Sequence, residues 1–417
     1  MNNQYLTVAC PPTTPTKHLS NEPASGSKER HGASSEYNVA FAYLRAFIIV
    51  LVILHHTAVA YFLPAAPPPA SSLAENLHSI RGISPVIDLQ HSKLFFFVVF
   101  FNDRFFMPLM FFISGLFVWG SLQRKGRLVF FRDRLVRLGI PFVVMTILAP
   151  LTYYTTYLQA GGNSGPVGFW QQWFSLGNWP TGPAWFIWLL LAFDIFVILL
   201  SALVPSGSDF HKKMPSGAVL RPASFFGLLV IVSAASYIPM AAIYDPNFSW
   251  WYWGPFSFQL SRVFLYLVYF LIGVILGAYG IQRTLLVPKS TLARHWVMWI
   301  VVALAALLAN IVATFGQANK TLIAVSFLLF CAAACLACLS IFLKFARNRR
   351  RILESLFRNS YGIYVIHYVV VNWLLYAMLT VPLPAIAKGS IVFVCSLAFC
   401  WGTISIIRRI PAVARVI

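Results

Sequence analysis

The sequence predicts an all-α membrane protein with about ten transmembrane helices and with its N- and C-termini in the cytosol. The chain of 417 residues is 59% hydrophobic and only 10% charged, with a mean hydropathy of +0.74. A soluble domain carries about 25% charged residues. The apolar residues gather in blocks of about twenty, enough to cross a bilayer once as a helix. Basic residues concentrate in alternate loops between these blocks.

Ten apolar blocks follow one another along the chain. They span about 40–63, 94–120, 139–160, 184–204, 223–243, 262–280, 296–316, 321–343, 360–380 and 389–407. The second block is interrupted by Asn102-Asp103-Arg104 and by Pro108. We expect the first block to act as a signal anchor, because it is long enough to span the membrane.

The ends of the chain differ from this apolar domain of residues 39–407. Residues 1–38 are rich in Pro, Thr, Ser and Asn and lack an apolar core, so we expect a disordered tail there. Residues 408–417 form a short basic tail, which we place in the cytosol.

The basic residues are distributed unevenly between the two sets of loops. Alternate loops and the C-terminal tail hold 21 Lys and Arg, whereas the intervening loops hold 5. Because Lys and Arg are enriched in cytosolic loops, this difference orients both termini toward the cytosol. A formal charge of +20 would suggest nucleic acid as the partner of a soluble protein. In a membrane protein we instead expect contacts with anionic lipids and anionic soluble ligands, and no nucleic acid.

Three of the six cysteines, Cys331, Cys335 and Cys338, fall in one apolar block at helical spacing. Cys335 and Cys338 form a C-x-x-C pair, but no second pair or histidine cluster accompanies it. Small packing residues are the favoured interpretation, and redox or metal chemistry is a remote one. We expect no metal and no permanently bound cofactor.

The first block carries two ionisable side chains on one helical face. Ten residues separate Arg45 from His56. Steps of about 100° bring the two side chains back to one stripe, about 16 Å apart along the axis, whereas His55 points about 100° away. Ionisable groups inside a membrane usually face a cavity or a partner and mark function. We therefore interpret this helix as the wall of an active site, with His56 functional and His55 its neighbour.

The second block places Asp103, Arg104 and Ser114 among apolar residues, and Ser114 belongs to the run Phe111-Phe112-Ile113-Ser114-Gly115. Mutual neutralisation of Asp103 and Arg104 near one end of the block is one interpretation. A role in binding the acceptor substrate is the other.

Arg134 and Arg137 lie three residues apart just before the third block, so they share a helical face. Arginine forks bind phosphate oxygens through two nitrogens, so a pair at the cytosolic mouth could hold the phosphates of a donor. The plainer alternative is a topology signal in contact with lipid phosphate, which is sufficient for Arg124, Lys125 and Arg127.

Two further features carry aromatic or imidazole groups. The loops 161–185 and 245–259 are rich in tryptophan, which is typical of an interfacial belt and, less often, of a flat platform for sugars or polycyclic acceptors. His367 follows Ser360-Tyr-Gly-Ile-Tyr-Val-Ile in the ninth block. A lone histidine in such a helix is more often a hydrogen-bonded packing residue than a catalyst.

Together these residues resemble the acyltransferase-3 family of integral membrane acyltransferases. That family includes O-acetyltransferases of bacterial polysaccharides and macrolides, and glucan-succinylating proteins. The matching pieces are Leu44-Arg45 with His56, Phe111-Phe112-Ile113-Ser114-Gly115, Arg132-Asp133-Arg134-Leu-Val-Arg137-Leu-Gly-Ile-Pro141, Gly182-Pro-Ala-Trp185-Phe186 and the run from Ser360 to His367. They occur in the order of the family and cover the chain from about 40 to 407. The run His56-Thr57-Ala58 is most similar to the glucan-succinylating branch.

The resemblance implies an integral membrane acyltransferase, in a bacterial inner membrane or a eukaryotic cell membrane or endomembrane. Its donor would be cytosolic acyl-CoA, and its acceptor a hydroxyl of a glycan, a lipid-linked sugar or a small natural product, with O-acetylation or O-succinylation as the reaction. The resemblance further implies catalytic roles for His56 and Arg45 and donor binding by Arg45, Arg134 and Arg137. Substrate contacts are assigned to Asp103, Arg104, Ser114, Trp185 and His367.

In this scheme neutral His56 takes the proton of the acceptor hydroxyl, or it is acylated itself and passes the group on. The main alternative is a transporter or flippase of a glycan or lipid precursor. Transporters often show internal repeats with charges in both halves, whereas here no repeat is found and the intramembrane charges concentrate in the first two blocks. A receptor-like scaffold would not explain the spacing of Arg45 and His56.

Overall fold

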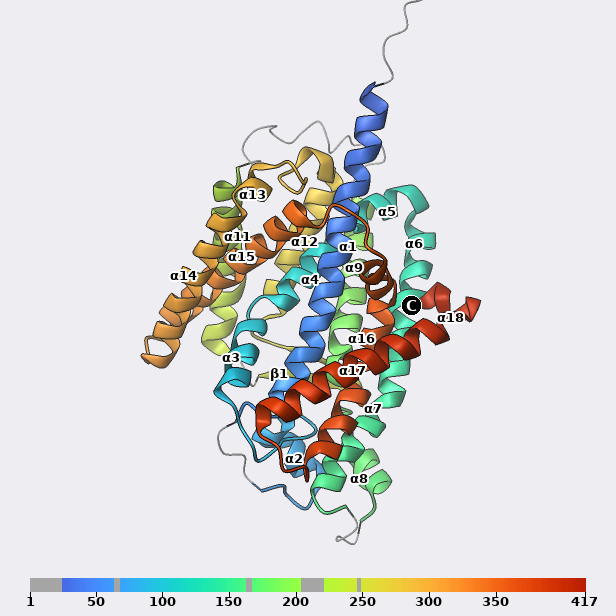
Figure 1. Cartoon of the computed structure of the whole chain (residues 1–417), viewed down its shortest axis with the longest axis vertical. Helices are drawn as coiled ribbons and strands as arrows, with labels where there is room; N and C mark the ends of the chain where they lie inside the picture. The colour runs from blue at the N-terminus through green and yellow to red at the C-terminus, as the bar shows by residue number, and fades with distance from the viewer. Residues whose placement is uncertain (1–24, 64–67, 163–166, 204–220, 246–248) are drawn as a thin grey trace, which may run out of the picture.

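The computed structural model describes residues 25–63, 68–162, 167–203, 221–245 and 249–417. Within these ranges all regular secondary structure is helical apart from one antiparallel two-stranded sheet (Figure 1). The α-helices are α1 (Ser25–Val59), α2 (Leu73–His78), α3 (Lys93–Asn102), α4 (Phe106–Gly115), α5 (Val118–Lys125), α6 (Arg127–Arg134), α7 (Ile140–Gln159), α8 (Phe169–Ser175), α9 (Trp185–Leu203), α11 (Pro222–Ile243), α12 (Val263–Tyr279), α13 (Thr291–Arg294), α14 (Trp296–Phe315), α15 (Lys320–Phe345), α16 (Arg351–Met378), α17 (Ala385–Ile407) and α18 (Pro411–Val416). The remaining elements are the short turns η1 (Ile80–Ile83), η2 (Leu135–Gly139), η3 (Gly182–Ala184) and η5 (Ile281–Arg283) and the strands β1 (Trp250–Trp253) and β2 (Phe256–Gln259).

Nine helical segments in the described ranges are long and apolar enough to cross a membrane, and the shorter apolar helix α12 joins them. Each of these segments overlaps one of the ten predicted blocks. Their lipid-facing sides carry exposed Leu, Ile, Val and Phe side chains, which is the surface expected in a bilayer. The prediction of an all-α, multi-pass membrane protein is confirmed.

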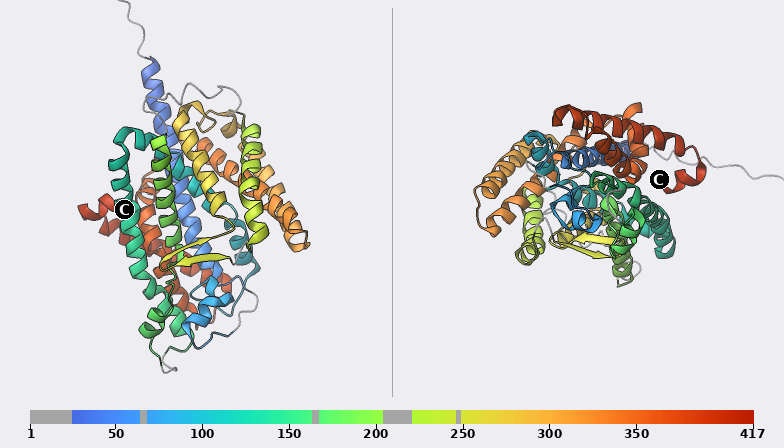
Figure 2. Two further views of the ribbon diagram at one scale, coloured as in Figure 1. Left: turned by 180° about the vertical axis from the view of Figure 1, so that it is seen from behind. Right: turned by 90° about the horizontal axis from the view of Figure 1, so that it is seen from below.

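Helix α1 runs through the middle of the bundle (Figures 1 and 2). It packs against α16, α3, α15, α17 and α4, so most of its surface faces protein rather than lipid. α1 begins at Ser25, so residues 25–38 are helical where a disordered tail is predicted. Extending an already nucleated helix avoids the cost of starting a new one, which explains the difference. Residues 1–24 of that tail lie outside the described ranges.

The second predicted block is divided by its polar residues. α3 ends at Asn102 and α4 begins at Phe106, so Asp103 and Arg104 lie in the break. The break is tied to a distant part of the chain, because Arg262 Nη1 donates a 3.0 Å hydrogen bond to the carbonyl oxygen of Asp103. Pro108 falls in the first turn of α4, where its missing N–H costs nothing.

The third membrane segment is longer than predicted. It begins with α6 at Arg127 and continues through η2, a π turn, into α7. Arg134 and Arg137 therefore belong to the helix itself, at and within the π turn. Such turns are uncommon inside α-helices and are frequent at functional sites.

Glycines allow α4 and α12 to pack backbone to backbone. A Cβ atom at Gly115 would overlap the carbonyl oxygen of Phe270, and one at Gly273 would overlap that of Phe112. Small residues permit this close approach between membrane helices, where van der Waals packing drives association. The contact sets the position of the α3–α4 break relative to the start of α12.

Helix α16 begins at Arg351, earlier than the predicted start near 360. Three of the nine added residues are charged, and two of them, Arg358 and Glu354, form an ion pair at 3.4 Å, one turn apart. Pairs at this spacing stabilise a helix. His367 consequently lies in the middle of α16 rather than near its start.

The cysteines of α15 pack in the core, in keeping with the interpretation of the sequence. Cys331 is 0% and Cys335 2% exposed. The thiol of Cys331 donates to the hydroxyl oxygen of Tyr269 over 3.3 Å.

The segment that follows α1 is joined to α17 by a buried ion pair. Lys388 Nζ lies 2.9 Å from Asp88 Oδ2, and the two side chains are only 2% and 4% exposed. The backbone N–H of Asp88 donates to the carbonyl oxygen of Ala60, just beyond the end of α1. Burial and the nearby Asp88 carboxylate raise the pKa of the Tyr61 hydroxyl, so this group stays protonated.

The β1–β2 hairpin is held against the start of α9. Trp188 Nε1 donates to the carbonyl oxygen of Ser257 at 2.8 Å, and Thr181 Oγ1 donates to that of Pro255 at 3.1 Å. The strands pair Trp250 with Gln259 and Trp253 with Phe256. Figure 2 shows the hairpin lying across the bundle beside α9 and α12.

Candidate active site

The polar stripe of α1 begins at Arg45, which contacts α4 and the residues that follow it. Its Nη2 donates to the carbonyl oxygen of Ile113 at 3.4 Å, and its guanidinium carbon lies 4.6 Å from the centre of the Phe117 ring. Arg134 is near enough to act on Arg45 electrostatically. Two of the three arginines that the sequence assigns to donor binding are thus within electrostatic range of each other.

At the opposite end of the stripe, His56 faces α16 rather than lipid. The centre of its ring is 5.4 Å from that of His367 and 4.9 Å from that of Tyr368. His56 keeps part of its surface exposed, although Thr57 and Ala58, which follow it, have none. An imidazole that is accessible inside the bundle is placed to meet a substrate.

His55 turns toward a different neighbourhood, as the helical phase predicts. Its ring lies 5.2 Å from that of Phe106, and Asp103 and Arg262 act on it electrostatically. The two adjacent histidines therefore face different residues: His56 faces α16, and His55 faces Phe106 of α4 and the charges of Asp103 and Arg262.

A row of aromatic residues on α16 extends from the backbone of Arg137 to the ring of His56. Tyr361, Tyr364 and Tyr368 follow one another at helical spacing on the same side as His367. The hydroxyl of Tyr361 donates to the carbonyl oxygen of Arg137 at 2.5 Å, and that of Tyr364 donates to the carbonyl oxygen of Pro183. These tyrosines were not predicted as site residues, although their helical spacing is visible in the sequence.

Arg134 has a partner that was not predicted from the sequence. Its Nε lies 3.2 Å from Oδ2 of Asp194 in α9, and the guanidinium stacks over Phe130 at 4.7 Å. The Asp194 side chain is 1% exposed, whereas that of Arg134 keeps 23%. The signal was a single carboxylate within the apolar block 184–204. A buried carboxylate requires a cation, and Arg134 supplies it.

Arg137 is exposed on the surface of the bundle. Arg134 and Arg137 both act electrostatically on the hydroxyl of Tyr361. The predicted arginine pair therefore meets α16, with Arg134 turned inward to Asp194 and Arg137 turned outward.

Asp103 and Arg104 each bond to a distant residue, and they also act on each other electrostatically. Asp103 Oδ2 pairs with Nη2 of Arg262 at 2.8 Å, and Arg104 Nε donates to Asn310 Oδ1 at 2.7 Å. Asp103 and Arg262 are far apart in sequence, so no local pattern reveals the pair. This network adjoins His55, on the other side of α1 from His367.

In the described part of the chain, Ser114 and Trp185 make no hydrogen bond or ring contact with His56. Ser114 follows Ile113, whose carbonyl oxygen accepts the hydrogen bond from Arg45. The Trp185 ring stacks on that of Tyr266 at 5.5 Å and meets Trp250 of the hairpin edge-on at 5.9 Å.

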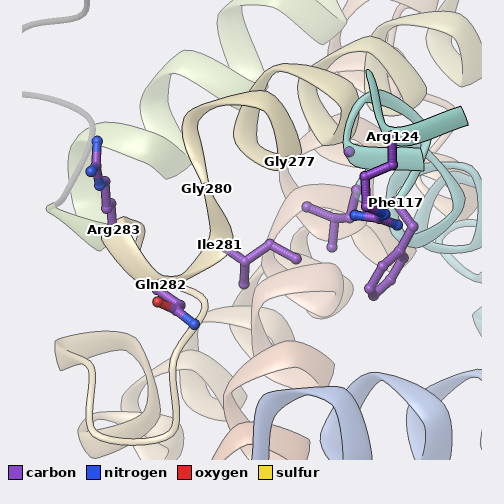
Figure 3. A pocket seen from close by; sticks show the side chains of 9 residues that line it. Phe117, Arg124, Gly277, Gly280, Ile281, Gln282 and Arg283 are labelled. Atoms are coloured by element: carbon purple, nitrogen blue, oxygen red, sulfur yellow. The ribbon is translucent and has the colours of Figure 1, made fainter. Parts of the chain in front are cut away.

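A pocket of about 410 Å³ adjoins Arg45 through the ring of Phe117. Figure 3 shows Phe117 and Arg124 on one side of it and Ile281 on the other, while Arg283 extends away. The described residues that line it are Leu116, Phe117, Gly120, Arg124, Gly277, Gly280, Ile281, Gln282 and Arg283. None of these is acidic, and the volume is within the range of small-molecule sites, about 300–1,000 Å³.

Comparison with known families bears on this arrangement. The chain matches the acyltransferase domain of the acyltransferase-3 family over residues 38–405. The protein belongs to this family. Neither the curated proteins nor the solved structures contain a match to the chain. As a member of the acyltransferase-3 family it is a membrane acyltransferase, and such an enzyme binds an acyl donor, an acceptor and lipids.

Proposed function

We propose that this acyltransferase-3 protein transfers an acyl group from cytosolic acyl-CoA to a hydroxyl of a glycan or a lipophilic acceptor. The observation that carries the proposal is the inner stripe of α1. One end of it, Arg45, is within electrostatic range of Arg134, and the other end, His56, lies against His367. A site with cations at one end and an accessible imidazole at the other suits an anionic thioester with its reacting carbon remote from its phosphates.

The donor would lie with its phosphates at the arginines. The contact of Arg134 with Asp194 uses Nε, which leaves the two terminal nitrogens for phosphate oxygens. Arg45 and Arg137 add positive charge nearby, and the pocket beside Phe117 offers room for the nucleotide. The pantetheine arm would then follow the stripe of α1 toward His56, a distance of about 16 Å along the helix.

His56 would act as the general base of the transfer. It takes the proton of the acceptor hydroxyl as the oxygen attacks the thioester carbonyl carbon, and the carbon–sulfur bond then breaks. A second route, in which His56 is acylated first and then passes the group to the hydroxyl, uses the same geometry. The similarity of His56-Thr57-Ala58 to the glucan-succinylating branch favours succinyl-CoA as the first donor to test.

The test is transfer by the purified protein in lipid nanodiscs. Labelled acetyl-, succinyl- and longer acyl-CoAs are offered with glucan, lipid-linked sugar and lipophilic acceptors, and the products are identified by mass spectrometry. We expect one donor to label one acceptor, with His56→Ala inactive but folded and still able to bind CoA. Absence of transfer to every acceptor, or normal turnover by His56→Ala, would refute the proposal.

A further inference from the structure

His367 is the second imidazole of the candidate site, and its environment is unusual for a packing residue. None of its surface is exposed, and it faces His56 across a ring separation of 5.4 Å. Tyr364 and Tyr368 flank it on α16. In the described part of the chain no carboxylate forms an ion pair with either histidine.

The tautomer of His367 follows from its backbone contact. Its Nδ1 lies 2.6 Å from the carbonyl oxygen of Tyr364. A carbonyl oxygen can only accept a hydrogen bond, so Nδ1 carries the proton and donates it. Nε2 therefore presents a lone pair.

No hydrogen-bond donor contacts the lone pair of His367 Nε2 in the described part of the chain. Nε2 is buried and lacks a hydrogen-bond partner among the residues that the structure describes. An unsatisfied buried acceptor destabilises the folded state, and such groups call for an explanation in function or in a missing partner. His56 is the adjacent group that can supply an N–H.

We propose that His367 is a positioning residue whose Nε2 accepts a hydrogen bond from an N–H of His56 during acyl transfer. This inference rests on the proposed function. The backbone of Tyr364 orients His367, His367 orients His56, and the other nitrogen of His56 then presents its lone pair to the acceptor hydroxyl. The arrangement extends the general rule that a catalytic base is itself oriented by a third group.

The proton balance of the reaction shows what His367 contributes. The acceptor oxygen forms a bond to the thioester carbonyl carbon, and its proton moves to His56. The carbon–sulfur bond breaks, and the leaving thiolate regains a proton from the His56 imidazolium. While that imidazolium exists, its second N–H needs an acceptor. Neutral His367 provides one, and repulsion between two adjacent cations keeps His367 itself unprotonated.

Two substitutions of His367 distinguish a role in positioning His56 from a role in packing alone. His367→Phe fills a similar volume without an acceptor, whereas His367→Gln places an amide oxygen near the position of Nε2. The matched control is His295→Gln, because His295 Nδ1 also bonds a backbone oxygen one turn earlier, at 2.9 Å, but on an exposed ring. The assays are kcat, the KM for acyl-CoA and the thermal unfolding temperature of each variant in nanodiscs.

We expect His367→Phe to lower kcat by about 10²- to 10⁴-fold, the contribution of an effective base, while the KM for acyl-CoA stays within about twofold. His367→Gln should recover at least about tenfold of that loss, and His295→Gln should match the wild type. Wild-type kcat in His367→Phe, or equal rates in His367→Phe and His367→Gln, would overturn the inference. If His367→Phe does not fold, His367→Asn replaces it, since its amide ends near Nδ1 and leaves Nε2 unreplaced. A wild-type protein that transfers no acyl group refutes the proposed function instead, which keeps the two failures distinct.

Discussion

Replacement of Gly182 by alanine should disturb the active site through a single displaced ring. Gly182 precedes α9 and has a φ of +54°. A Cβ atom there would fall inside the contact distance of the Tyr368 ring, at Cδ1 and Cε1. To regain a normal carbon–carbon separation of about 3.5–4.0 Å, the ring must move by about 1 Å. Tyr368 lies 4.9 Å from His56, so the movement reaches the proposed base.

Two effects of Gly182→Ala can be separated. The left-handed backbone costs about 1–2 kcal/mol for a residue with a Cβ. Gly254 supplies the control, because its φ is +55° and nothing lies within 4 Å of the position that a Cβ atom would take there. Gly254→Ala should therefore lose only the stability that the left-handed backbone costs, with no displaced ring.

The assay compares kcat and thermal unfolding for the two variants in nanodiscs. We expect Gly182→Ala to lose about 1–3 kcal/mol more stability than Gly254→Ala because of the overlap with the ring. We also expect a loss of kcat by about 10²-fold in Gly182→Ala alone, the effect of a misplacement of about 1 Å. Equal activity of Gly182→Ala and Gly254→Ala would show that the Tyr368 ring does not support catalysis, and the reasoning would be refuted.

Three further predictions address stability and donor binding. Lys388→Met should lower the free energy of unfolding by about 3–5 kcal/mol, because it leaves Asp88 buried and unpaired. The double variant Lys388→Met/Asp88→Leu should restore most of that loss. A denaturation series in which the double variant is as unstable as the single one would contradict this prediction. Arg134→Ala is combined with Asp194→Asn, so that no unpaired carboxylate remains. This double variant should raise the KM for acyl-CoA by about 10- to 100-fold, which corresponds to the loss of a charge-assisted hydrogen bond of about 1.5–3 kcal/mol. Its kcat should change little. An unchanged KM in steady-state kinetics would exclude Arg134 from the donor site. Gly273→Ala should destabilise the α4–α12 contact by about 1–3 kcal/mol in thermal unfolding, because its Cβ overlaps a backbone oxygen, and equal unfolding temperatures for this variant and the wild type would contradict it.

Local features of the site could be predicted because they depend on neighbours in the chain. The phase of Arg45 and His56 follows from helix geometry, and the break at Asp103 follows from polar residues inside an apolar block. The start of α16 could not be placed in this way, since its first turns are charged and look like a loop. The π turn that contains Arg137 has no recognised signal in the sequence.

Ion-pair partners that are far apart in the chain could not be predicted from the sequence. Asp103 pairs with Arg262 rather than with the adjacent Arg104, and Arg134 pairs with Asp194. The lone carboxylate of Asp194 indicated that a cation must lie near it, but several arginines could have filled that role. Only the packing of α6 and η2 against α9 selects Arg134.

By itself the sequence determined the membrane class, the ten apolar segments, the family and the polar face of α1, because length, hydropathy and helical phase are local properties. The tertiary structure alone decided which helices face that stripe, and so placed His367 beside His56 and Arg134 within electrostatic range of Arg45. Lipid tails are as apolar as leucine, so the apolar pattern of a membrane helix does not select its neighbours. Close packing at glycines and the pairing of buried charges make that selection, and both depend on contacts between residues far apart in the chain.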